Sequence, residues 1–253
     1  MSSHTVVATA NVHRGLGAAD ARRALDEVLE QEPDLIGLQE WHPWRARLLL
    51  ATGRVGLARG RRVGQRIGRQ NADHFWTMPV LGDCVVGARR DRFTLDEARV
   101  VPLSRPARAD KPERWLGIEP PHFATVAVYD DHVAGRRVSL VNYHLVPGVQ
   151  ARGRYRDDRP LLVARHQHEV RRVQRLVDEQ LALGHTTYAV GDSNFDGLRL
   201  DGLTSAWEGR DDQPGTLGPR RKVDDVFGPG PAVSVRLLEN ASDHKAVLVQ
   251  RPD

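Results

Sequence analysis

Residues 33–40 have the sequence PDLIGLQE, and this stretch decides the fold class. Its centre, residues 35–38, is an apolar run with the length of a buried strand, and the polar Gln39 and Glu40 follow at the strand's end. Upstream, apolar residues recur at helical spacing over 20–31, with Asp20 placed to cap the helix. The order predicts an amphipathic helix, a buried strand and a carboxylate at the edge of a sheet.

The same order of elements returns later in the chain. A helical pattern opens at Pro160 and stops near Gly184, and residues 187–190 follow as a strand. That strand ends in the sequence GDSN at 191–194, so an acidic residue again comes directly after a buried strand. The repeat, with little sequence identity between its copies, predicts two related halves that share one site.

Further strand-like segments complete the predicted sheets. They lie at residues 84–88, 124–129, 138–143, 223–227, 233–238 and 246–250. Three stretches rich in Gly, Pro and Arg, at 52–70, 102–121 and 147–159, are expected to be surface loops. This order favours an α/β fold, a four-layered α/β/β/α sandwich in which two mostly antiparallel sheets are flanked by helices. One domain over 1–253 is the expectation for this length.

Composition and charge narrow the class of protein. Apolar residues make up 40% of the 253 residues and charged residues 28%, as in ordinary globular proteins. The net charge of +4 and a pI of about 9.6 favour an anionic partner, although a genome that replaces Lys by Arg throughout gives the same bias. The composition gives no indication of oligomeric state.

Two further observations bear on location. The single cysteine, Cys84, lies in an apolar run and is expected to be a buried thiol. The sequence after Met1 lacks the pattern of a signal peptide, and no apolar run is long enough to cross a bilayer. We therefore expect a cytoplasmic protein without a membrane span.

Polar side chains that would be wasted in a core stand where predicted strands end. They are Asn11, Glu40, Asn142, His144, Asp192, Asn194, Asp224, Asp243 and His244. Hard divalent cations prefer oxygen ligands, which Asn11, Glu40 and Asp243 supply. Attack on a phosphoester also needs a positioned water, a proton acceptor and donors to the phosphoryl oxygens. His144, Asp192, Asn194 and His244 carry those groups.

Six motifs in this order resemble those of the endonuclease/exonuclease/phosphatase superfamily, which includes pancreatic-type deoxyribonucleases, abasic-site endonucleases, neutral sphingomyelinases and inositol polyphosphate phosphatases. They are Asn11-Val12, PDLIGLQE at 33–40, NYHL at 142–145, GDSN at 191–194, Val223-Asp224 and Ser242-Asp243-His244. The resemblance implies Mg²⁺, or sometimes Mn²⁺, bound by Glu40 with Asn11 and Asp243 nearby. It further implies that Asp224 orients His244 to activate water, and that Asp192 and Asn194 position the nucleophile and the phosphate. His144 would donate to a phosphate oxygen or protonate the leaving group.

The chain departs from the family pattern at several positions. The motif usually reads Gly-Asp-Phe-Asn, whereas here Ser193 replaces the aromatic residue and Phe195 follows the Asn. His13 stands near Asn11, where some relatives carry an acid, and Asp225 follows Asp224, where an aromatic residue is common. His166 and His168 look like a ligand pair, but at i,i+2 on a helix they point in different directions and are expected to be solvated.

Structural interpretations compete with the functional ones. Asp224 could form a surface pair with Lys222, Asp243 could end a turn with His244 as its cap, and Asn142 could make a structural hydrogen bond. A Gly-x-Ser-x-Gly elbow is missing around Ser193, so a serine hydrolase is not indicated.

The function expected from these residues is metal-dependent cleavage of phosphodiester bonds in nucleic acid. Arginines in 52–70 and at Arg152, Arg154, Arg156 and Arg159 favour DNA or RNA over small phosphoesters, because backbone phosphates attract such cations. An alternative is a phosphatase or phospholipase that cleaves an inositol phosphate or a lipid head group. A third is a binding protein that keeps the fold without catalysis, which the full set of acids and histidines argues against.

Overall fold

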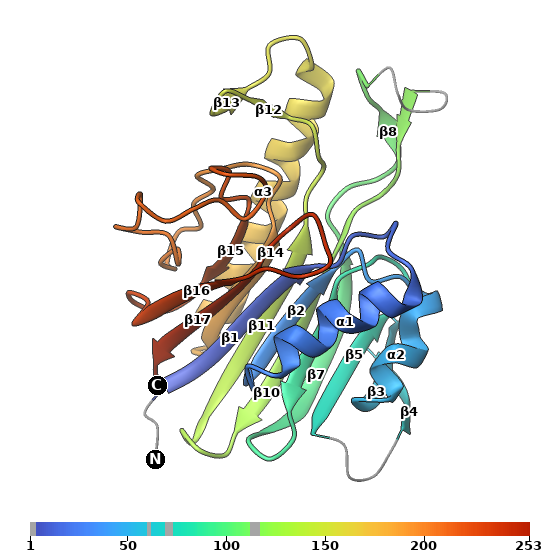
Figure 1. Ribbon diagram of the computed structural model, residues 1–253, viewed down its shortest axis with the longest axis vertical. Coiled ribbons are helices and arrows are strands. Elements are labelled where there is room, and N and C mark those ends of the chain that lie inside the picture. The colour runs from blue at the N-terminus through green and yellow to red at the C-terminus, as the bar shows by residue number, and fades with distance from the viewer. Residues whose placement is uncertain (1–3, 60–61, 69–72, 112–116) are drawn as a thin grey trace.

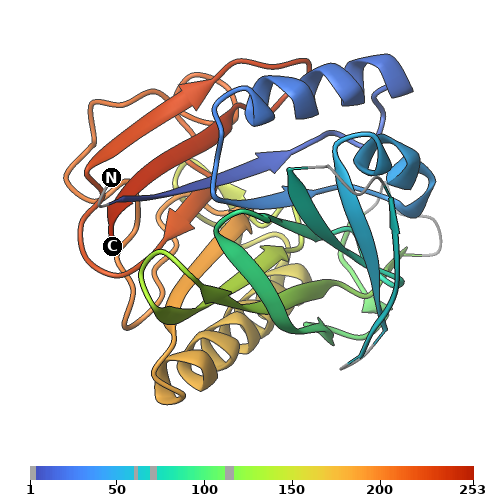
Figure 2. The same cartoon turned by 90° about the horizontal axis from the view of Figure 1, so that it is seen from below.

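The computed structural model describes residues 4–59, 62–68, 73–111 and 117–253. Two large β-sheets pack face to face between two helices, as the view from below shows (Figure 2). Helix α1 (Ala18–Leu29) covers the outer face of one sheet, and helix α3 (Pro160–Ala182) covers the outer face of the other. The predicted α/β/β/α sandwich is confirmed.

The larger sheet has eight strands. In spatial order they are β16 (Ser234–Leu238), β17 (Ala246–Pro252), β1 (His4–Asn11), β2 (Leu35–Gln39), β6 (Val85–Arg89), β5 (His74–Pro79), β3 (Gly53–Arg59) and β4 (Arg62–Gly68). The second sheet contains β15 (Asp224–Phe227), β14 (Thr186–Asp192), β11 (Arg136–His144), β10 (Phe123–Asp131) and β7 (Phe93–Pro102). Most neighbouring pairs are antiparallel, whereas β1–β2, β3–β5 and β11–β14 are parallel.

Two parallel pairs explain the repeat in the sequence. Each belongs to a β-α-β unit, β1-α1-β2 in the larger sheet and β11-α3-β14 in the second (Figure 1). The register pairs Asn11 with Gln39 in one unit and His144 with Asp192 in the other. Because parallel strands finish at the same edge, each unit delivers two polar strand ends to one end of the sandwich.

Small residues and one buried amide bring the sheets together near that end. A Cβ on Gly37 would lie 2.3 Å from Cγ2 of Val190, so only glycine allows this approach. The buried Asn142 accepts a hydrogen bond from Nε2 of Gln39 at 2.6 Å and donates to the carbonyl oxygens of Leu38 and Val85. Asn142 of the second sheet thus makes structural hydrogen bonds to the first, the alternative that the sequence left open.

Several elements differ from the sequence prediction. The expected loop at 52–70 contains β3 and β4, because frequent glycines and arginines hid two strands, of which β3 pairs with β5 and β4 pairs with β3. Its residues 60, 61, 69 and 70 lie outside the described part. The other two expected loops contain short hairpins, β8 (Ala107–Arg108) with β9 (Ile118–Glu119), and β12 (Gln150–Ala151) with β13 (Arg154–Tyr155).

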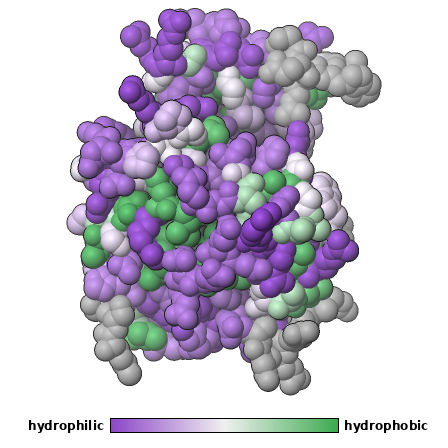
Figure 3. Space-filling view, in the orientation of Figure 1, coloured by the Kyte–Doolittle hydropathy of each residue, from purple (hydrophilic) through white to green (hydrophobic). Residues whose placement is uncertain are grey.

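Other details correct or complete the prediction. Gly17 is the N-cap of α1, so Asp20 lies inside the first turn and does not cap the helix. Strands β5 and β7 and the short helices η1 (Pro43–Arg45) and α2 (Ala46–Leu50) were not predicted. Cys84 is a buried thiol, as expected. The face that carries α1 is mainly hydrophilic (Figure 3), and within the described residues no helix has the length and apolarity needed to span a membrane.

Candidate functional site

The predicted site residues meet at the end of the sandwich where β1, β2, β11 and β14 finish. Hydrogen bonds and ion pairs connect Asn11, Glu40, His144, Asp192, Asn194, Asp224 and His244. Asp224 also lies here because β15 runs antiparallel to β14 and therefore begins where β14 ends. Asp243 joins through His13, which contacts both Asp243 and Glu40. All eight predicted residues are therefore brought together.

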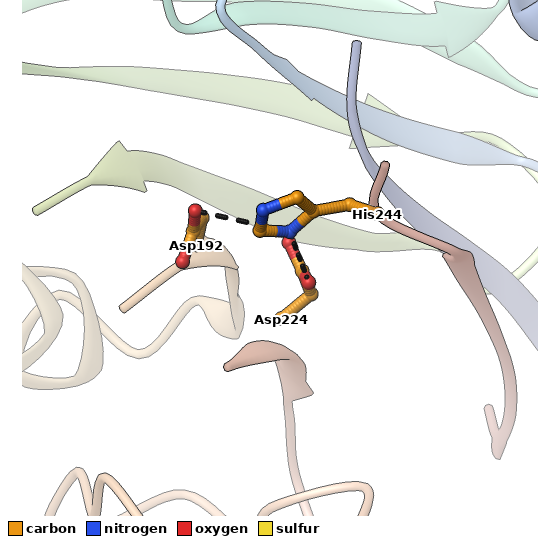
Figure 4. Close-up of side chains that lie close together, drawn as sticks. All are labelled: Asp192, Asp224 and His244. Carbon is orange, nitrogen blue, oxygen red and sulfur yellow. Dashed lines mark hydrogen bonds and ion pairs between the residues drawn. The ribbon is translucent and has the colours of Figure 1, made fainter. Parts of the chain in front are cut away.

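The ring of His244 lies between the carboxylates of Asp192 and Asp224 (Figure 4). Nδ1 of His244 lies 2.8 Å from Oδ2 of Asp224 and 3.9 Å from Oδ2 of Asp192. All three side chains are buried, and each offers one ligand atom within 4.8 Å of the others. Asp224 faces this histidine, so the alternative of a surface pair with Lys222 is wrong; Nζ of Lys222 instead lies over the Trp207 ring.

Two asparagines complete the surroundings of Asp192. The backbone N–H of Asn194 donates to Oδ1 of Asp192 at 2.7 Å, and its side-chain Nδ2 donates to Oδ2 at 3.2 Å. Nδ2 of Asn11 donates to the same Oδ2 at 3.0 Å. These donors fix the carboxylate from both β-α-β units, so its position depends on the packing of the two sheets.

The electrostatics of this cluster follow from burial and from neighbouring charges. Burial raises the pKa of Asp192 to about 6, and the charge of Asp224 acts in the same direction. Burial alone would lower the pKa of His244, but the carboxylate of Asp224 raises it to about 9. A positive imidazolium therefore faces two acidic groups at neutral pH.

The three predicted metal ligands connect to Asp192 through Asn11. Oε1 of Glu40 accepts a hydrogen bond from Nδ2 of Asn11 at 3.4 Å, and Nδ1 of His13 lies 3.8 Å from Oε2 of Glu40 and 3.8 Å from Oδ1 of Asp243. Oδ1 of Asn11 is buried and has no hydrogen-bond partner among the described residues. An unpartnered buried oxygen beside two carboxylates suits a hard divalent cation, so this oxygen set fits Mg²⁺ or Mn²⁺.

The sequence did not identify Asp83 as part of the site. Its Oδ2 lies 3.1 Å from Nδ1 of His144, whose Nε2 lies 3.8 Å from Oδ2 of Asp192. Burial would lower the pKa of His144, but the charge and hydrogen bond of Asp83 raise it to about 10. Burial would likewise raise the pKa of Asp83, but His144 lowers it to about 2. A second Asp–His pair thus faces Asp192.

His122 is a further histidine that the sequence analysis missed. Its ring lies 6.1 Å from the ring of His144, and the buried carboxylates of Glu119 and Glu169 lie 3.8 and 3.4 Å from its two nitrogens. Burial would lower the pKa of His122, but these two glutamates raise it. The adjacent pocket has a volume of about 390 Å³ and is lined by His122 together with His144, Asp192, Asn194, His244, Glu40, Asp83, His42, His13 and Arg14, among others.

The local backbone is held in unusual conformations at two site residues. Glu40 has φ of 56° and Asn194 has φ of 51°, values that cost energy for residues other than glycine. Gly191 has φ of 148°, and a Cβ there would lie 1.9 Å from the Tyr143 carbonyl oxygen, which excludes any side chain. Strain of this kind concentrates at functional sites.

A buried arginine supports the Glu40 side of the site. Arg45 is 3% exposed, and its Nη1 donates to the carbonyl oxygens of Val12 at 2.7 Å and Glu40 at 3.4 Å. Its Nη2 donates to the carbonyl oxygens of His13 at 2.9 Å and Leu16 at 3.0 Å. One guanidinium therefore ties the segment after β1 to the segment after β2.

The helix α3 supports the Asp192 side, and here the prediction for His166 was wrong. His166 is buried; its Nε2 lies 2.7 Å from the carbonyl oxygen of Ser193 and its Nδ1 lies 3.1 Å from the hydroxyl of Tyr155. The ring of Phe195 packs on Tyr155 at 4.3 Å. Phe195 thus fills space behind a loop in which Ser193, which donates to the Val223 carbonyl oxygen, replaces the usual aromatic residue. His168 is exposed, as expected.

Comparison with known proteins supports the fold. No family model matches the chain, and a search of curated proteins gives no match either. The solved structure of D. rerio TDP2 complexed with single strand DNA product is 15% identical and covers 98% of this chain and 99% of that one, with a TM-score of 0.64. The human Nocturnin catalytic domain with bound sulfate anion is 16% identical over 99% of this chain and 94% of that one, with a TM-score of 0.62.

A third similar structure carries the family name. It is an endonuclease/exonuclease/phosphatase family protein from Bacteroides thetaiotaomicron, 17% identical over 98% of this chain and 97% of that one, with a TM-score of 0.61. The chain therefore has the fold of endonuclease/exonuclease/phosphatase proteins. The resemblance expected from the sequence motifs is confirmed at the level of the fold.

Proposed function

We propose that this protein is a divalent-metal-dependent phosphodiesterase that acts on nucleic acid. The observation that carries the proposal is the convergence on Asp192 of two Asp–His pairs and two asparagines, beside an oxygen-rich set of metal ligands. Groups that titrate away from their usual range cluster at functional sites. Here they line a pocket wide enough for a phosphoester.

Glu40, Asn11 and Asp243 would hold the cation. Their side-chain oxygens match the preference of Mg²⁺ and Mn²⁺, and the unpartnered Oδ1 of Asn11 is an oxygen that a cation would satisfy. When bound, such a cation supplies Lewis acidity and neutralises negative charge on the phosphoryl oxygens.

Asp192 is the group placed to accept a proton from the attacking water. Its carboxylate faces the pocket and is held by donors from Asn194 and Asn11, so its remaining lone pairs have a fixed direction. Positioning of this kind removes much of the entropic cost of bringing a nucleophile to the reaction. Asn194 would orient the carboxylate and the phosphate.

The two histidines would bind the phosphoryl group from opposite sides of Asp192. Asp224 engages Nδ1 of His244, which leaves Nε2 as the nitrogen for the substrate, and Asp83 does the same for His144. Such an imidazolium donates a hydrogen bond to a phosphoryl oxygen, and His144 can also give its proton to the leaving oxygen. Asp83 and Asp224 act through their histidines and are positioning residues.

Nucleic acid is the proposed substrate because the chain is positively charged and because a structure of the same fold was solved with DNA. The net charge is +4, and Arg14 lines the pocket. The D. rerio TDP2 structure of the same fold was obtained with a single strand DNA product. The arginines at 152 and 154 are exposed on the hairpin β12–β13, where a polyanion can reach them.

The test is a screen of phosphorylated substrates with the purified chain after EDTA treatment. Labelled single-stranded DNA, single-stranded RNA and duplex DNA are compared with an inositol phosphate and a phosphorylated lipid head group, with Mg²⁺ or Mn²⁺ restored. We expect cleavage of oligonucleotides that returns with metal and weakens steeply as salt increases, since released counterions drive binding of a polyanion.

Matched variants assign the activity to this site. Glu40→Gln and His244→Ala should each lose cleavage by about a hundred-fold or more, whereas Glu239→Gln and His132→Ala, at exposed positions, should cleave as the wild type does. Cleavage that survives EDTA, or that Glu40→Gln leaves intact, would contradict the proposal. Activity confined to the inositol phosphate or the lipid head group would overturn nucleic acid as the substrate and retain metal-dependent phosphoester cleavage as the reaction.

A further inference from the structure

An aromatic stack extends outward from the candidate active site on the Glu40 side. The ring of His42 lines the pocket together with Asp83 and His144. The indole of Trp44 stacks on His42 with ring centroids 4.2 Å apart and planes 12° apart. Trp44 lies in η1, directly before α2, and is 66% exposed, so with one face against His42 the rest of the indole is open to solvent.

The segment that carries this stack is firmly anchored. Trp41 before it is fully buried, Arg45 after it makes four hydrogen bonds to backbone carbonyls, and Leu49 in α2 is buried. The exposed indole is therefore presented by a rigid support. A ligand that stacks on a preorganised ring does not have to order the protein segment, so less entropy is lost on binding.

Charge in this region suits a ligand that is aromatic and anionic at once. The ring of His42 covers one face of the Trp44 indole, so the other face is left as a flat stacking surface. Arg14, which lines the pocket, and Arg47, three residues beyond Trp44 in the chain, are both exposed. Proteins that bind single-stranded nucleic acids combine exposed aromatic rings with cationic side chains.

We propose that Trp44, backed by His42, is the stacking platform for an unpaired base that flanks the scissile phosphate. The inference rests on the proposed function and makes the substrate class narrower. A base inside a duplex has both faces covered by its neighbours, and only an unpaired base can turn to stack on a protein ring. The enzyme therefore acts on single-stranded or frayed nucleic acid, with little dependence on the identity of that base.

The experiment compares Trp44→Ala and Trp44→Phe with Leu183→Ala, a control at a 62% exposed position after α3. Each enzyme is assayed on short single-stranded oligonucleotides with one scissile position, and on analogues that lack one base at a time. On the intact oligonucleotide, Trp44→Ala should raise KM on the order of ten-fold, Trp44→Phe should retain most of the wild-type affinity, and Leu183→Ala should match the wild type.

The base-deleted analogues separate stacking from a structural effect. At one position next to the cleaved phosphate, deleting the base should raise the KM of the wild type by the same factor as Trp44→Ala does. The same deletion should leave the KM of Trp44→Ala unchanged, because the stacking interaction is already gone. The platform is refuted if Trp44→Ala has the same KM as Leu183→Ala on every intact oligonucleotide. It is also refuted if every base deletion raises the KM of Trp44→Ala by the same factor as it raises that of the wild type.

Binding measured in EDTA distinguishes failure of the stacking platform from failure of the proposed function. Without metal, the oligonucleotide should quench tryptophan fluorescence in the wild type and much less in Trp44→Phe, and this readout does not require catalysis. Quenching without cleavage under any metal condition would overturn the proposed function and retain the platform. Cleavage with identical quenching in both proteins would overturn the platform and retain the function.

Discussion

Two buried charged clusters lie at opposite ends of the sandwich, and they are built differently. The Arg92 cluster, near the labelled termini in Figure 1, consists of Arg92, Asp34, Asp131, Asp253 and Thr5. Arg92 donates to Asp131 through Nε at 3.0 Å and Nη2 at 2.7 Å, and Asp131 also accepts from the backbone N–H groups of Val133 and Ala134. The guanidinium and its acids satisfy one another.

The Asp192 cluster, which consists of Asp192, Asp224, His244, Asn11 and Asn194, leaves atoms unsatisfied. Oδ1 of Asn11 and Oδ1 of Asp224 are buried and have no hydrogen-bond partner among the described residues. Burial and Asp224 raise the pKa of Asp192, whereas Arg92 outweighs burial and lowers that of Asp131. Buried charge is therefore satisfied internally at one end of the fold. At the other end, buried oxygens lack partners among the described residues, and the function proposed above assigns them to a ligand.

The largest expected effect is on catalysis at the Asp192 cluster. In His244→Asn the amide can take the place of Nδ1 and keep a donor toward Asp224, while Nε2 is lost. The value of kcat should fall about a thousand-fold, and the free energy of unfolding should fall by about 2 kcal/mol, because a neutral amide replaces the imidazolium that pairs with Asp224. Steady-state kinetics and urea unfolding measure the two quantities. A variant that is strongly destabilised but keeps its kcat would show that the Asp192 cluster serves stability and not catalysis.

The opposite result is expected at the Arg92 cluster. Arg92→Met leaves the buried Asp131 without its cation and removes the main cation of Asp34 and Asp253, so the free energy of unfolding should fall by about 3–5 kcal/mol, with kcat per folded molecule unchanged. Arg137→Met, at an exposed arginine that pairs with Asp96 and Asp130, should cost less than about 1 kcal/mol. If Arg92→Met does not fold, Arg92→Lys supplies the measurement with a smaller loss. A thousand-fold loss of kcat in the folded variant would erase the distinction between the clusters.

The sequence predicted the fold because its strongest patterns are those of the two β-α-β units. In each unit, mainly apolar strands of five to nine residues with polar residues at their ends lie on both sides of an amphipathic helix. Strands β3 and β4, at one end of the larger sheet, were missed because glycine and arginine interrupt the apolar alternation. The pairing of β3 with β5 and of β4 with β3 is a tertiary effect.

The same reasoning explains which site residues were found. Asn11, Glu40, His144 and Asp192 end strands of parallel pairs, and each stood in a motif. Asp83 and His122 come shortly before β6 and β10, strands that run antiparallel to β2 and β11. In an antiparallel pair, the residue before one strand lies beside the end of the other strand. The sequence alone does not show which strands pair, so it could not place Asp83 and His122 at the site. His166 was misassigned because helical spacing does not reveal which polar side chains a helix buries.

The second Asp–His pair, Asp83 and His144, predicts how the stability of the protein depends on pH. The pKa of His144, about 10, lies above the 6.5 of a free imidazole, so its stabilising contribution is complete below pH 6.5 and is lost as pH rises toward 10. The pKa of Asp83, about 2, lies below 3.8, so its contribution is complete above pH 3.8 and is lost as pH falls toward 2. The pair should stabilise the protein most between pH 3.8 and 6.5.

Asp83→Asn tests this window. The variant should be less stable than the wild type by about 2 kcal/mol near pH 5, as for loss of a charge-assisted hydrogen bond, and the difference should shrink toward pH 10. The imidazole of His144 should titrate well below pH 10 in the variant, as followed by NMR. Asp158→Asn, at an exposed acid, serves as the control. A stability difference that is constant from pH 5 to pH 10 would show that Asp83 contributes packing and no charge.

The smallest effect concerns the support of the Asp192 loop. His166 differs from His144 and His244 in having a hydroxyl and a carbonyl as hydrogen-bonding partners, and burial lowers its pKa. Tyr155→Phe removes the hydroxyl that pairs with Nδ1 of His166 and should cost about 1 kcal/mol in the free energy of unfolding.

Tyr143→Phe is the matched control, because the Tyr143 hydroxyl is buried and has no hydrogen-bond partner among the described residues. Removing an unsatisfied polar group lifts a desolvation cost, so this variant should be as stable as the wild type or slightly more stable. Equal losses in the two variants would mean that the His166 bond adds nothing to the loop. The Asp192 loop would then be held by sheet packing and by its other hydrogen bonds, such as that of Ser193 to the Val223 carbonyl oxygen.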